Sequence, residues 1–176
     1  MKRLLVSAIA VVLLVSAGTS RAAEPEEQPS EPAPRVAALN LDFGTLPTGW
    51  EAARNPDGEL RGNTNIVTNS DEDGRIIVIS DTKSGKTLKE IADSFVTINK
   101  ARGLKITDAV KDKDGNMTAE VTLVKAGKEV GKGFAIFRTF AKDPEGVYLF
   151  MGMWPNTAKP ATAKQARAIA LCAKLK

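Results

Sequence analysis

The sequence predicts an α+β fold in which an antiparallel sheet of about six to seven strands is covered by two main helices. Two observations carry this prediction. Several short segments alternate apolar and polar residues, which is the period of strands with one buried face. Two longer segments, residues 87–103 and 162–175, instead repeat apolar residues at helical spacing. Turn sequences separate the short segments, which favours antiparallel pairing of neighbours.

The first strands are predicted from alternation and from the turns between them. Residues 39–43 alternate apolar and polar side chains, and residues 46–49 (Leu-Pro-Thr-Gly) then turn the chain. A second turn, Asn-Pro-Asp-Gly at residues 55–58, precedes an apolar pair at residues 66–67. Residues 75–79 are rich in β-branched side chains, so we expect a strand in the interior of the sheet there.

The first helix is predicted from its two ends and its apolar stripe. Thr87 and Glu90 fit a capping box, in which each side chain satisfies a free backbone donor of the other residue. Gly103 is placed to end the helix in a left-handed conformation. The stripe consists of Leu88, Ile91, Ala92, Phe95 and Ile98.

The second half of the chain predicts four strands and a final helix. Between residues 104 and 154 the period returns to two, and three turn sequences divide this stretch into an antiparallel meander. Thr162 and Gln165 offer a second capping box. The apolar side of this last helix is expected to contain Ala168, Ile169, Leu171, Cys172 and Leu175.

The N-terminus has the organisation of a secretory signal peptide. A charged start is followed by an apolar run and by small residues before a cleavage site after Ala22. The run is too short to span a membrane, so the mature chain is expected to lack a transmembrane segment and to be periplasmic or secreted. Residues 23–34 are rich in Pro and Glu and are predicted to form a disordered tail. A single α+β domain then covers residues 35–176.

Charge and residue types exclude several classes of function. Residues 1–22 contain three basic side chains and no acidic one, so their removal lowers the formal charge from +4 to +1, and no nucleic-acid partner is predicted. The absence of histidine excludes His-based catalysis and His metal ligands. Cys172 is the one cysteine, interpreted as a small buried residue, with a bridge between two chains or a reactive thiol as the alternatives.

Two segments resemble phosphate- or calcium-binding loops. Residues 84–87, Ser-Gly-Lys-Thr, lie where a phosphate-binding loop would end, but the required first glycine is replaced by Ser80, so a capped helix start is favoured. Asn69, Asp71 and Asp73 match the first half of a calcium loop whose final glutamate is missing. A turn rich in Asx residues explains the same pattern, and calcium stays the alternative.

Three further groups of residues have both a structural and a functional interpretation. Met151 and Met153 place two thioethers on one strand face, which suits Cu⁺ but also an ordinary core. The glycines at 131, 133 and 152 allow a helix or a ligand to approach the sheet. The large amphipathic aromatics, which either fill the core or anchor a partner, are Trp50, Tyr148 and Trp154.

The order of elements, together with Phe43 and the Leu-Pro-Thr-Gly-Trp segment at residues 46–50, is similar to the PsbP-like fold, named for an extrinsic subunit of the photosynthetic oxygen-evolving complex. It also resembles exported bacterial DcrB-type relatives. The resemblance covers most of residues 39–176. It implies an accessory protein that docks onto a larger assembly, and it brings no catalytic motif.

These observations predict a non-enzymatic, exported accessory domain without a cofactor, which binds an envelope protein or assembly through a sheet edge or a loop end. The alternative is a periplasmic protein that binds a small ligand or a metal, Ca²⁺ or Cu⁺, between the sheet and a helix. A hydrolase that uses Asp and Glu side chains is a third hypothesis, because carboxylates are plentiful on the predicted turns.

Overall fold

The computed structural model describes residues 41–54, 64–69 and 74–176, all of which fall within one unit, Val36–Lys176. The predicted signal peptide, the predicted tail and the predicted start of the domain at Arg35 lie outside these residues. Neither helix within them is long and apolar enough to cross a membrane.

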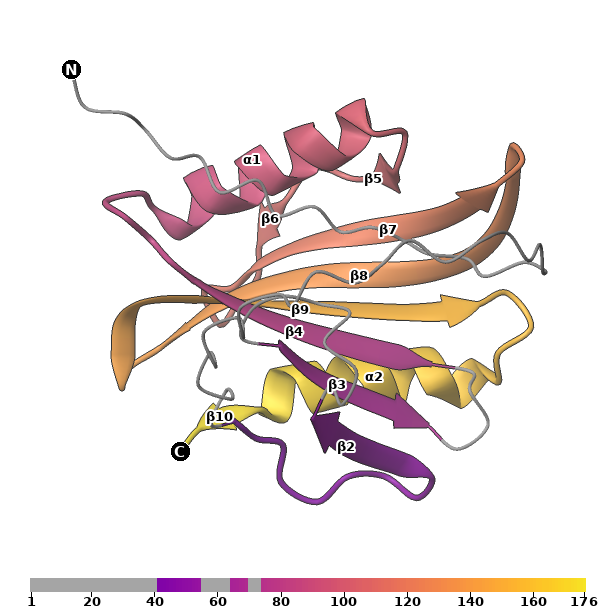
Figure 1. Ribbon diagram of the computed structural model, residues 1–176, viewed down its shortest axis with the longest axis horizontal. Coiled ribbons are helices and arrows are strands. Elements are labelled where there is room, and N and C mark those ends of the chain that lie inside the picture. Colours follow the sequence, from indigo (N-terminus) through magenta and orange to yellow (C-terminus); the bar gives the residue numbers. More distant parts are fainter. Residues whose placement is uncertain (1–40, 55–63, 70–73) are drawn as a thin grey trace, which may run out of the picture. The chain divides into compact units, whose positions relative to one another are not determined.

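The described strands form an antiparallel sheet and a small separate ribbon, which confirms the predicted fold class (Figure 1). The ribbon pairs β1 (Leu41–Asp42) with β10 (Lys174–Leu175). The main sheet has eight strands in the described part of the chain. Their order is β2 (Trp50–Arg54), β3 (Thr64–Asn69), β4 (Arg75–Thr82), β9 (Asp143–Pro155), β8 (Lys128–Phe140), β7 (Met117–Lys125) and β5 (Lys105–Ile106), with β6 (Val110–Lys111) also paired with β7.

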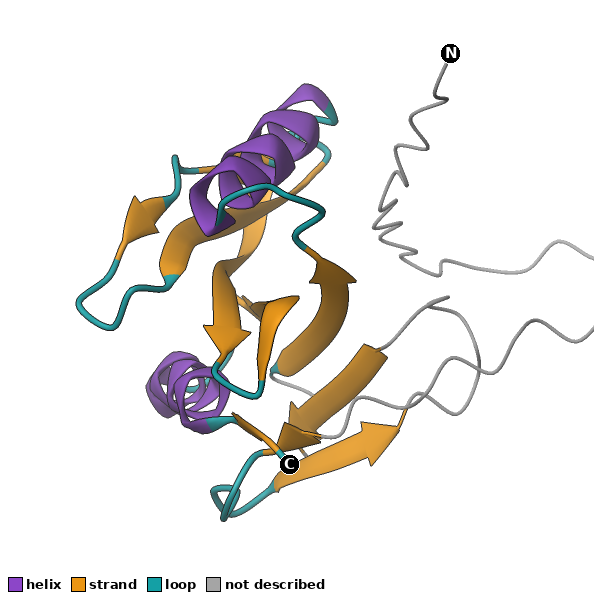
Figure 2. Cartoon of the chain, turned by 90° about the vertical axis from the view of Figure 1, so that its left-hand side faces the viewer, coloured by secondary structure: helices purple, strands orange, loops and turns teal. Residues whose placement is uncertain are grey.

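The helices α1 (Leu88–Ala101) and α2 (Pro160–Cys172) pack on opposite faces of this sheet. On β8, Phe137 contacts Phe95 of α1 with 5.3 Å between the ring centroids. Phe134 and Ile136 instead belong to the core cluster that contains Ile169 of α2. Because successive strand residues point to opposite faces, the two helices lie on different sides of β8. Figure 2 shows them with strands between them.

The predicted start of α1 is confirmed. The Thr87 hydroxyl accepts a hydrogen bond from the Glu90 amide at 3.2 Å, and the Glu90 carboxylate accepts one from the Thr87 amide at 2.8 Å. The preceding Ser84 and Gly85 have φ of 48° and 81° and form a tight turn closed by the Lys86 amide on the Lys83 carbonyl. Residues 84–87 are therefore a turn and a helix cap, as the favoured prediction has it.

The buried stripe of α1 is rotated from the predicted one. Ala92, Val96 and Asn99 are buried, whereas Ile98 is 44% exposed. Asn99 tolerates burial because its side-chain amide donates to the backbone carbonyl of Phe95 at 2.8 Å. The backbone carbonyl of Asn99 in turn accepts a hydrogen bond from the Leu104 amide at 2.9 Å. A polar residue thus occupies the inner face where the helix ends.

The second predicted capping box is wrong, because the N-cap of α2 lies three residues earlier than Thr162. Lys159 is the N-cap, without a side-chain hydrogen bond to the helix, and Pro160 starts the helix with its fixed φ. Thr162 is buried at 2% exposure beneath Gly74, where a Cβ would approach its methyl group to 2.8 Å. The buried side of α2 also differs from the predicted one. It consists of Thr162, Ala166, Ile169 and Ala170, whereas Ala168, Leu171 and Cys172 are exposed and Leu175 lies beyond the helix in β10.

The glycines of the sheet allow close packing between neighbouring strands, whereas the favoured prediction was the close approach of a helix. A Cβ at Gly152 would collide with the ring of Phe134 on the neighbouring strand, so this ring fills the space above the glycine. At Gly131 and Gly133 the space is taken by the backbone of β9. The three positions therefore leave no ligand cleft at this place in the sheet.

Candidate functional site

Two of the three aromatic residues predicted as partner anchors lie in the core. Trp50 is 5% exposed and its indole N–H donates to Gln165 Oε1 of α2 at 3.1 Å. Tyr148 is 4% exposed and its hydroxyl donates to Asp143 Oδ2 at 2.8 Å. Trp154 is half-buried, with its ring centroid 5.9 Å from that of Phe134. Core filling thus accounts for Trp50 and Tyr148, and Trp154 alone retains partial exposure.

The turn at residues 46–50 explains the inward position of Trp50. The Trp50 amide donates to the Pro47 carbonyl at 3.0 Å, and Gly49 has a φ of 84°, as a turn of this kind requires at its third position. The turn in the Leu-Pro-Thr-Gly-Trp segment therefore positions Trp50 in the core against α2. The role of this segment is structural.

The environment of Tyr148 disfavours its ionisation. Burial raises the pKa of Tyr148 to about 12, and the hydrogen bond to the Asp143 carboxylate and its negative charge act in the same direction. The ring also packs edge-on against Phe140 with 4.8 Å between centroids. Tyr148 is therefore a neutral core residue that fixes the hairpin between β8 and β9.

The structure describes three of the five predicted metal ligands, namely Asn69, Met151 and Met153. Asn69 ends β3 opposite Trp50, whereas Asp71 and Asp73 lie outside the described residues, so the calcium prediction is not tested. Met151 is 3% exposed between Ile77 and Ala135 on the adjacent strands, and Met153 is half-buried. These are the surroundings of core methionines. In residues 41–54, 64–69 and 74–176, no group of three His, Cys, Asp or Glu side chains is placed to hold a metal ion.

Cys172 is exposed, and the prediction that it is buried is therefore wrong. Cys172 is the last residue of α2, and the buried side of the helix at this end is formed by Ile169 and Ala170 instead. The nearby carbonyls of Ala170 and Ala173 accept hydrogen bonds from the Arg138 guanidinium at 2.6 and 3.1 Å. Burial lowers the pKa of this guanidinium. Arg138 thus serves as a cap for the C-terminal end of α2, and a bridge between two chains through Cys172 stays a prediction.

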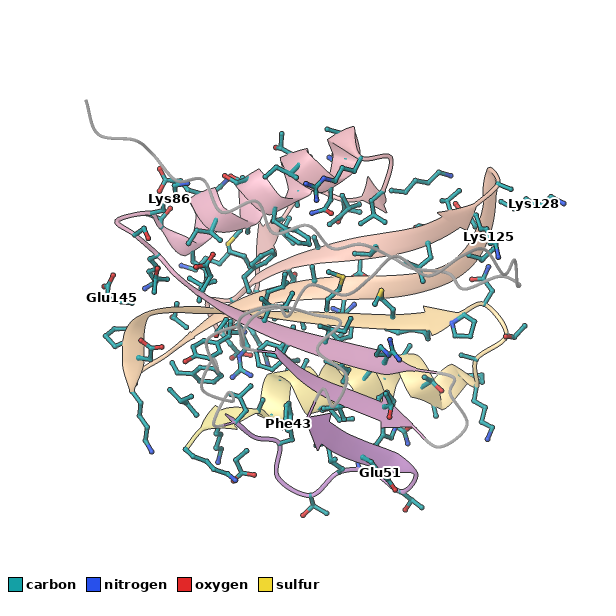
Figure 3. The ribbon with its side chains drawn as sticks, in the orientation of Figure 1. Phe43, Glu51, Lys86, Lys125, Lys128 and Glu145 are labelled. Carbon is teal, nitrogen blue, oxygen red and sulfur yellow. The ribbon has the colours of Figure 1, made fainter. Side chains whose placement is uncertain are left out.

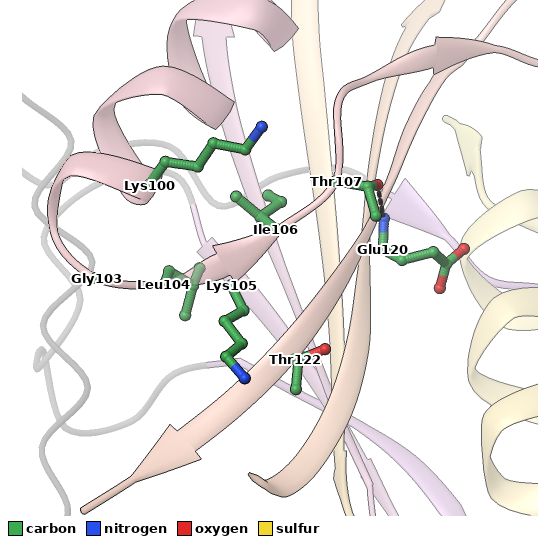
Figure 4. Close-up of a pocket in the computed structure, with 8 residues that line it drawn as sticks. All are labelled: Lys100, Gly103, Leu104, Lys105, Ile106, Thr107, Glu120 and Thr122. Carbon is green, nitrogen blue, oxygen red and sulfur yellow. Dashed lines mark hydrogen bonds between the residues drawn. The ribbon is translucent and has the colours of Figure 1, made fainter. Parts of the chain in front are cut away.

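One open hollow of about 530 Å³ lies where α1 ends beside the edge of the sheet (Figure 4). We call it the β5–β7 hollow. Its lining residues are Lys100, Gly103, Leu104, Lys105, Ile106, Thr107, Glu120 and Thr122. Gly103, with a φ of 84°, ends α1 and directs the chain into β5. Sequence reasoning identified this glycine but did not predict the hollow that follows it.

The edge strand is interrupted beside the hollow. The Thr107 amide donates to the Glu120 carbonyl at 3.0 Å, but the Glu120 amide donates to the Thr107 hydroxyl at 2.9 Å instead of to a backbone carbonyl. The side chain thereby replaces one rung of the ladder, and pairing with β7 resumes only at Val110. The single predicted strand over residues 104–111 is therefore two short strands with an irregular segment between them.

The charged residues that line the hollow are all in ion pairs. Lys100 binds Asp108 at 2.6 Å, and this hydrogen bond lowers the pKa of the Asp108 carboxyl. Lys105 binds Glu129 at 3.2 Å. Both oxygens of Glu120 accept from Arg167 Nη2 of α2, at 2.7 and 3.0 Å.

These pairs decide what the hollow can do. Their side chains are exposed, so they contribute little to stability, but they neutralise the rim around Leu104 and Ile106. Glu120 is the one carboxylate among the lining residues, and its oxygens are held by Arg167. The arrangement suits recognition of an apolar group within a polar rim, rather than acid–base or nucleophilic chemistry.

The described antiparallel sheet with two helices is an α+β architecture, and it matches the PsbP-like fold. Among solved structures it is similar to cyanobacterial PsbP (CyanoP) from Synechocystis sp. PCC 6803, with a TM-score of 0.54 and 15% identity. The match covers 85% of this chain and 100% of the CyanoP chain. No family model matches the chain, and no curated protein matches its sequence. The predicted PsbP-like resemblance is thus confirmed for the fold, and the DcrB-type relation stays a prediction.

Proposed function

We propose that this chain is an exported, non-enzymatic accessory domain that binds an envelope protein at the β5–β7 hollow. The observation that supports this function best is the apolar floor at Leu104 and Ile106 inside a rim of ion-paired side chains. Protein interfaces have the same anatomy, with an apolar centre and a polar rim.

Two further observations support the proposal. The sequence of residues 1–22 predicts a secretory leader, and such a leader brings a mature chain to the periplasm or beyond, where an envelope partner is available. The large aromatic side chains that might have built a deep ligand cavity instead fill the core, as Trp50 and Tyr148 do.

Site-specific photo-cross-linking tests this function. A photoreactive amino acid replaces Leu104 in one variant and Glu51, which is exposed on β2 at the opposite edge of the sheet, in the control. We expect light-dependent adducts with one envelope protein from position 104 and none from position 51, in cells that export the chain.

Two outcomes would contradict the proposal: equal adducts from both positions, or a mature chain that is retained in the cytoplasm. A thermal shift with a small metabolite or a metal ion, in the absence of any adduct, would instead support the ligand-binding alternative.

A further inference from the structure

Two features destabilise the tip of the hairpin between β7 and β8. Ala126 and Gly127 form the turn with φ of 50° and 76°, and a left-handed conformation is unfavourable for alanine. Lys125 and Lys128 lie directly opposite each other in the strand register. Like charges in this position repel each other. Both lysines are exposed at the same end of the sheet (Figure 3).

These two lysines are not neutralised by the part of the protein that the structure describes. Neither of them takes part in the ion pairs Lys89–Asp93, Lys100–Asp108, Lys105–Glu129 and Arg167–Glu120 of the described residues. Glu129, which follows Lys128 directly, is bound by Lys105 at 3.2 Å. The carboxylate nearest in sequence is therefore already used at the rim of the hollow, and the tip keeps a positive charge.

The hairpin tip continues the β5–β7 hollow along one strand. β5 covers β7 only as far as the pair of Lys105 with Thr122, and both of these residues line the hollow. Beyond Thr122, β7 continues to Lys125, and this last part of the strand pairs only with β8 in the described residues. The outer edge of residues 123–125 thus joins the hollow to the two lysines. An extended segment laid along this edge would meet the hollow first and the lysines next.

We propose that the partner presents an acidic extended segment, which places an apolar side chain beside Leu104 and its carboxylates against Lys125 and Lys128. The inference rests on the function proposed above, whose site it extends. Carboxylates between the two ammonium groups relieve the repulsion that the free hairpin retains. Charge complementarity of this kind adds specificity and a faster association.

A labelled acidic peptide tests the proposal directly. The probe is a fluorescein-labelled peptide of alternating Glu and Leu residues, and its control replaces every Glu by Gln. We expect anisotropy to detect binding of the acidic peptide at low salt, weakened by added salt because the Debye length shortens. The double substitution Lys125→Gln/Lys128→Gln should weaken this binding by about tenfold or more.

The matched control changes two other exposed lysines at the opposite end of β7. The substitutions Lys111→Gln/Lys113→Gln remove the same charge and should leave peptide binding unchanged. Urea unfolding of the Lys125→Gln/Lys128→Gln chain should show equal or greater stability, because the repulsion is gone. A loss of binding therefore cannot come from unfolding.

Several results would overturn the acidic partner: no binding of the Glu peptide, equal binding of the Gln peptide, equal losses in both lysine variants, or binding to phosphatidylglycerol vesicles in place of the peptide. Cross-linking separates this failure from that of the proposed function. If adducts at position 104 persist undiminished in the Lys125→Gln/Lys128→Gln chain, the hollow binds a partner but the acidic segment is wrong.

Discussion

Tyr148 offers a measurement at the scale of a single residue, because it is the one tyrosine of the chain. Its neutral hydroxyl is buried and donates to Asp143, which raises its pKa from 10.0 to about 12. In an alkaline titration followed by tyrosinate absorbance, we expect a midpoint near 12 for the folded protein and near 10 in urea.

The direction of the pH dependence follows from the same shift. Between pH 10 and 12 the unfolded chain has released the Tyr148 proton and the folded chain has not, so stability falls as the pH rises through this window. Below pH 10 the contribution is fully present. Tyr148→Phe removes this contribution of the tyrosine to the pH dependence. The same midpoint in native and urea-unfolded protein would contradict the buried environment of Tyr148.

At the scale of an element, the start of α1 depends on one side chain. Thr87→Ala removes the hydroxyl that accepts the Glu90 amide, and an N-cap of this kind contributes about 1 kcal/mol to the free energy of unfolding. Thr97→Ala, at an exposed position inside the same helix, is the matched control and should be neutral or slightly stabilising. Urea unfolding measures both variants, and equal losses would refute the capping role.

The two helices show which parts of an element are readable from local sequence. Thr87 and Glu90 are separated by three residues at the true start of α1, so the local pattern and the fold agree. Thr162 and Gln165 have the same spacing, but Pro160 begins α2 earlier and both side chains are used in packing, against Gly74 and Trp50. The two pairs have the same local spacing, and tertiary contacts determine that only the first forms a capping box.

The candidate site was less predictable than the fold for the same reason. Beside the hollow, the Thr107 hydroxyl replaces a backbone acceptor, and the residue whose amide it accepts, Glu120, lies 13 positions away. Alternation along residues 104–111 predicts one continuous strand and contains no signal for this interruption. By contrast, the interior strand at residues 75–79 was predicted correctly, because its β-branched run is a local property.

At the scale of the whole molecule, the ends of the described chain meet in the ribbon of β1 and β10. Leu41 pairs with Leu175, and Asp42 pairs with Lys174. Leu41 is buried in the cluster that also holds Ile169 of α2, and Leu175 packs against that cluster. The ribbon therefore closes the core at the end of α2 where Arg138 caps the helix.

Removal of Lys174, Leu175 and Lys176 tests this closure. The shortened chain loses the backbone pairing with β1 and the apolar contact of Leu175, so we expect a loss of about 1–2 kcal/mol in the free energy of unfolding. Amide exchange at Leu41 and Asp42 should become faster, whereas exchange in β8 and β9 should change only with global stability. Removal of Lys176 alone is the control. If the shortened chain unfolds at the same urea concentration as this control, the ribbon does not stabilise the fold, and the core is complete without its last strand.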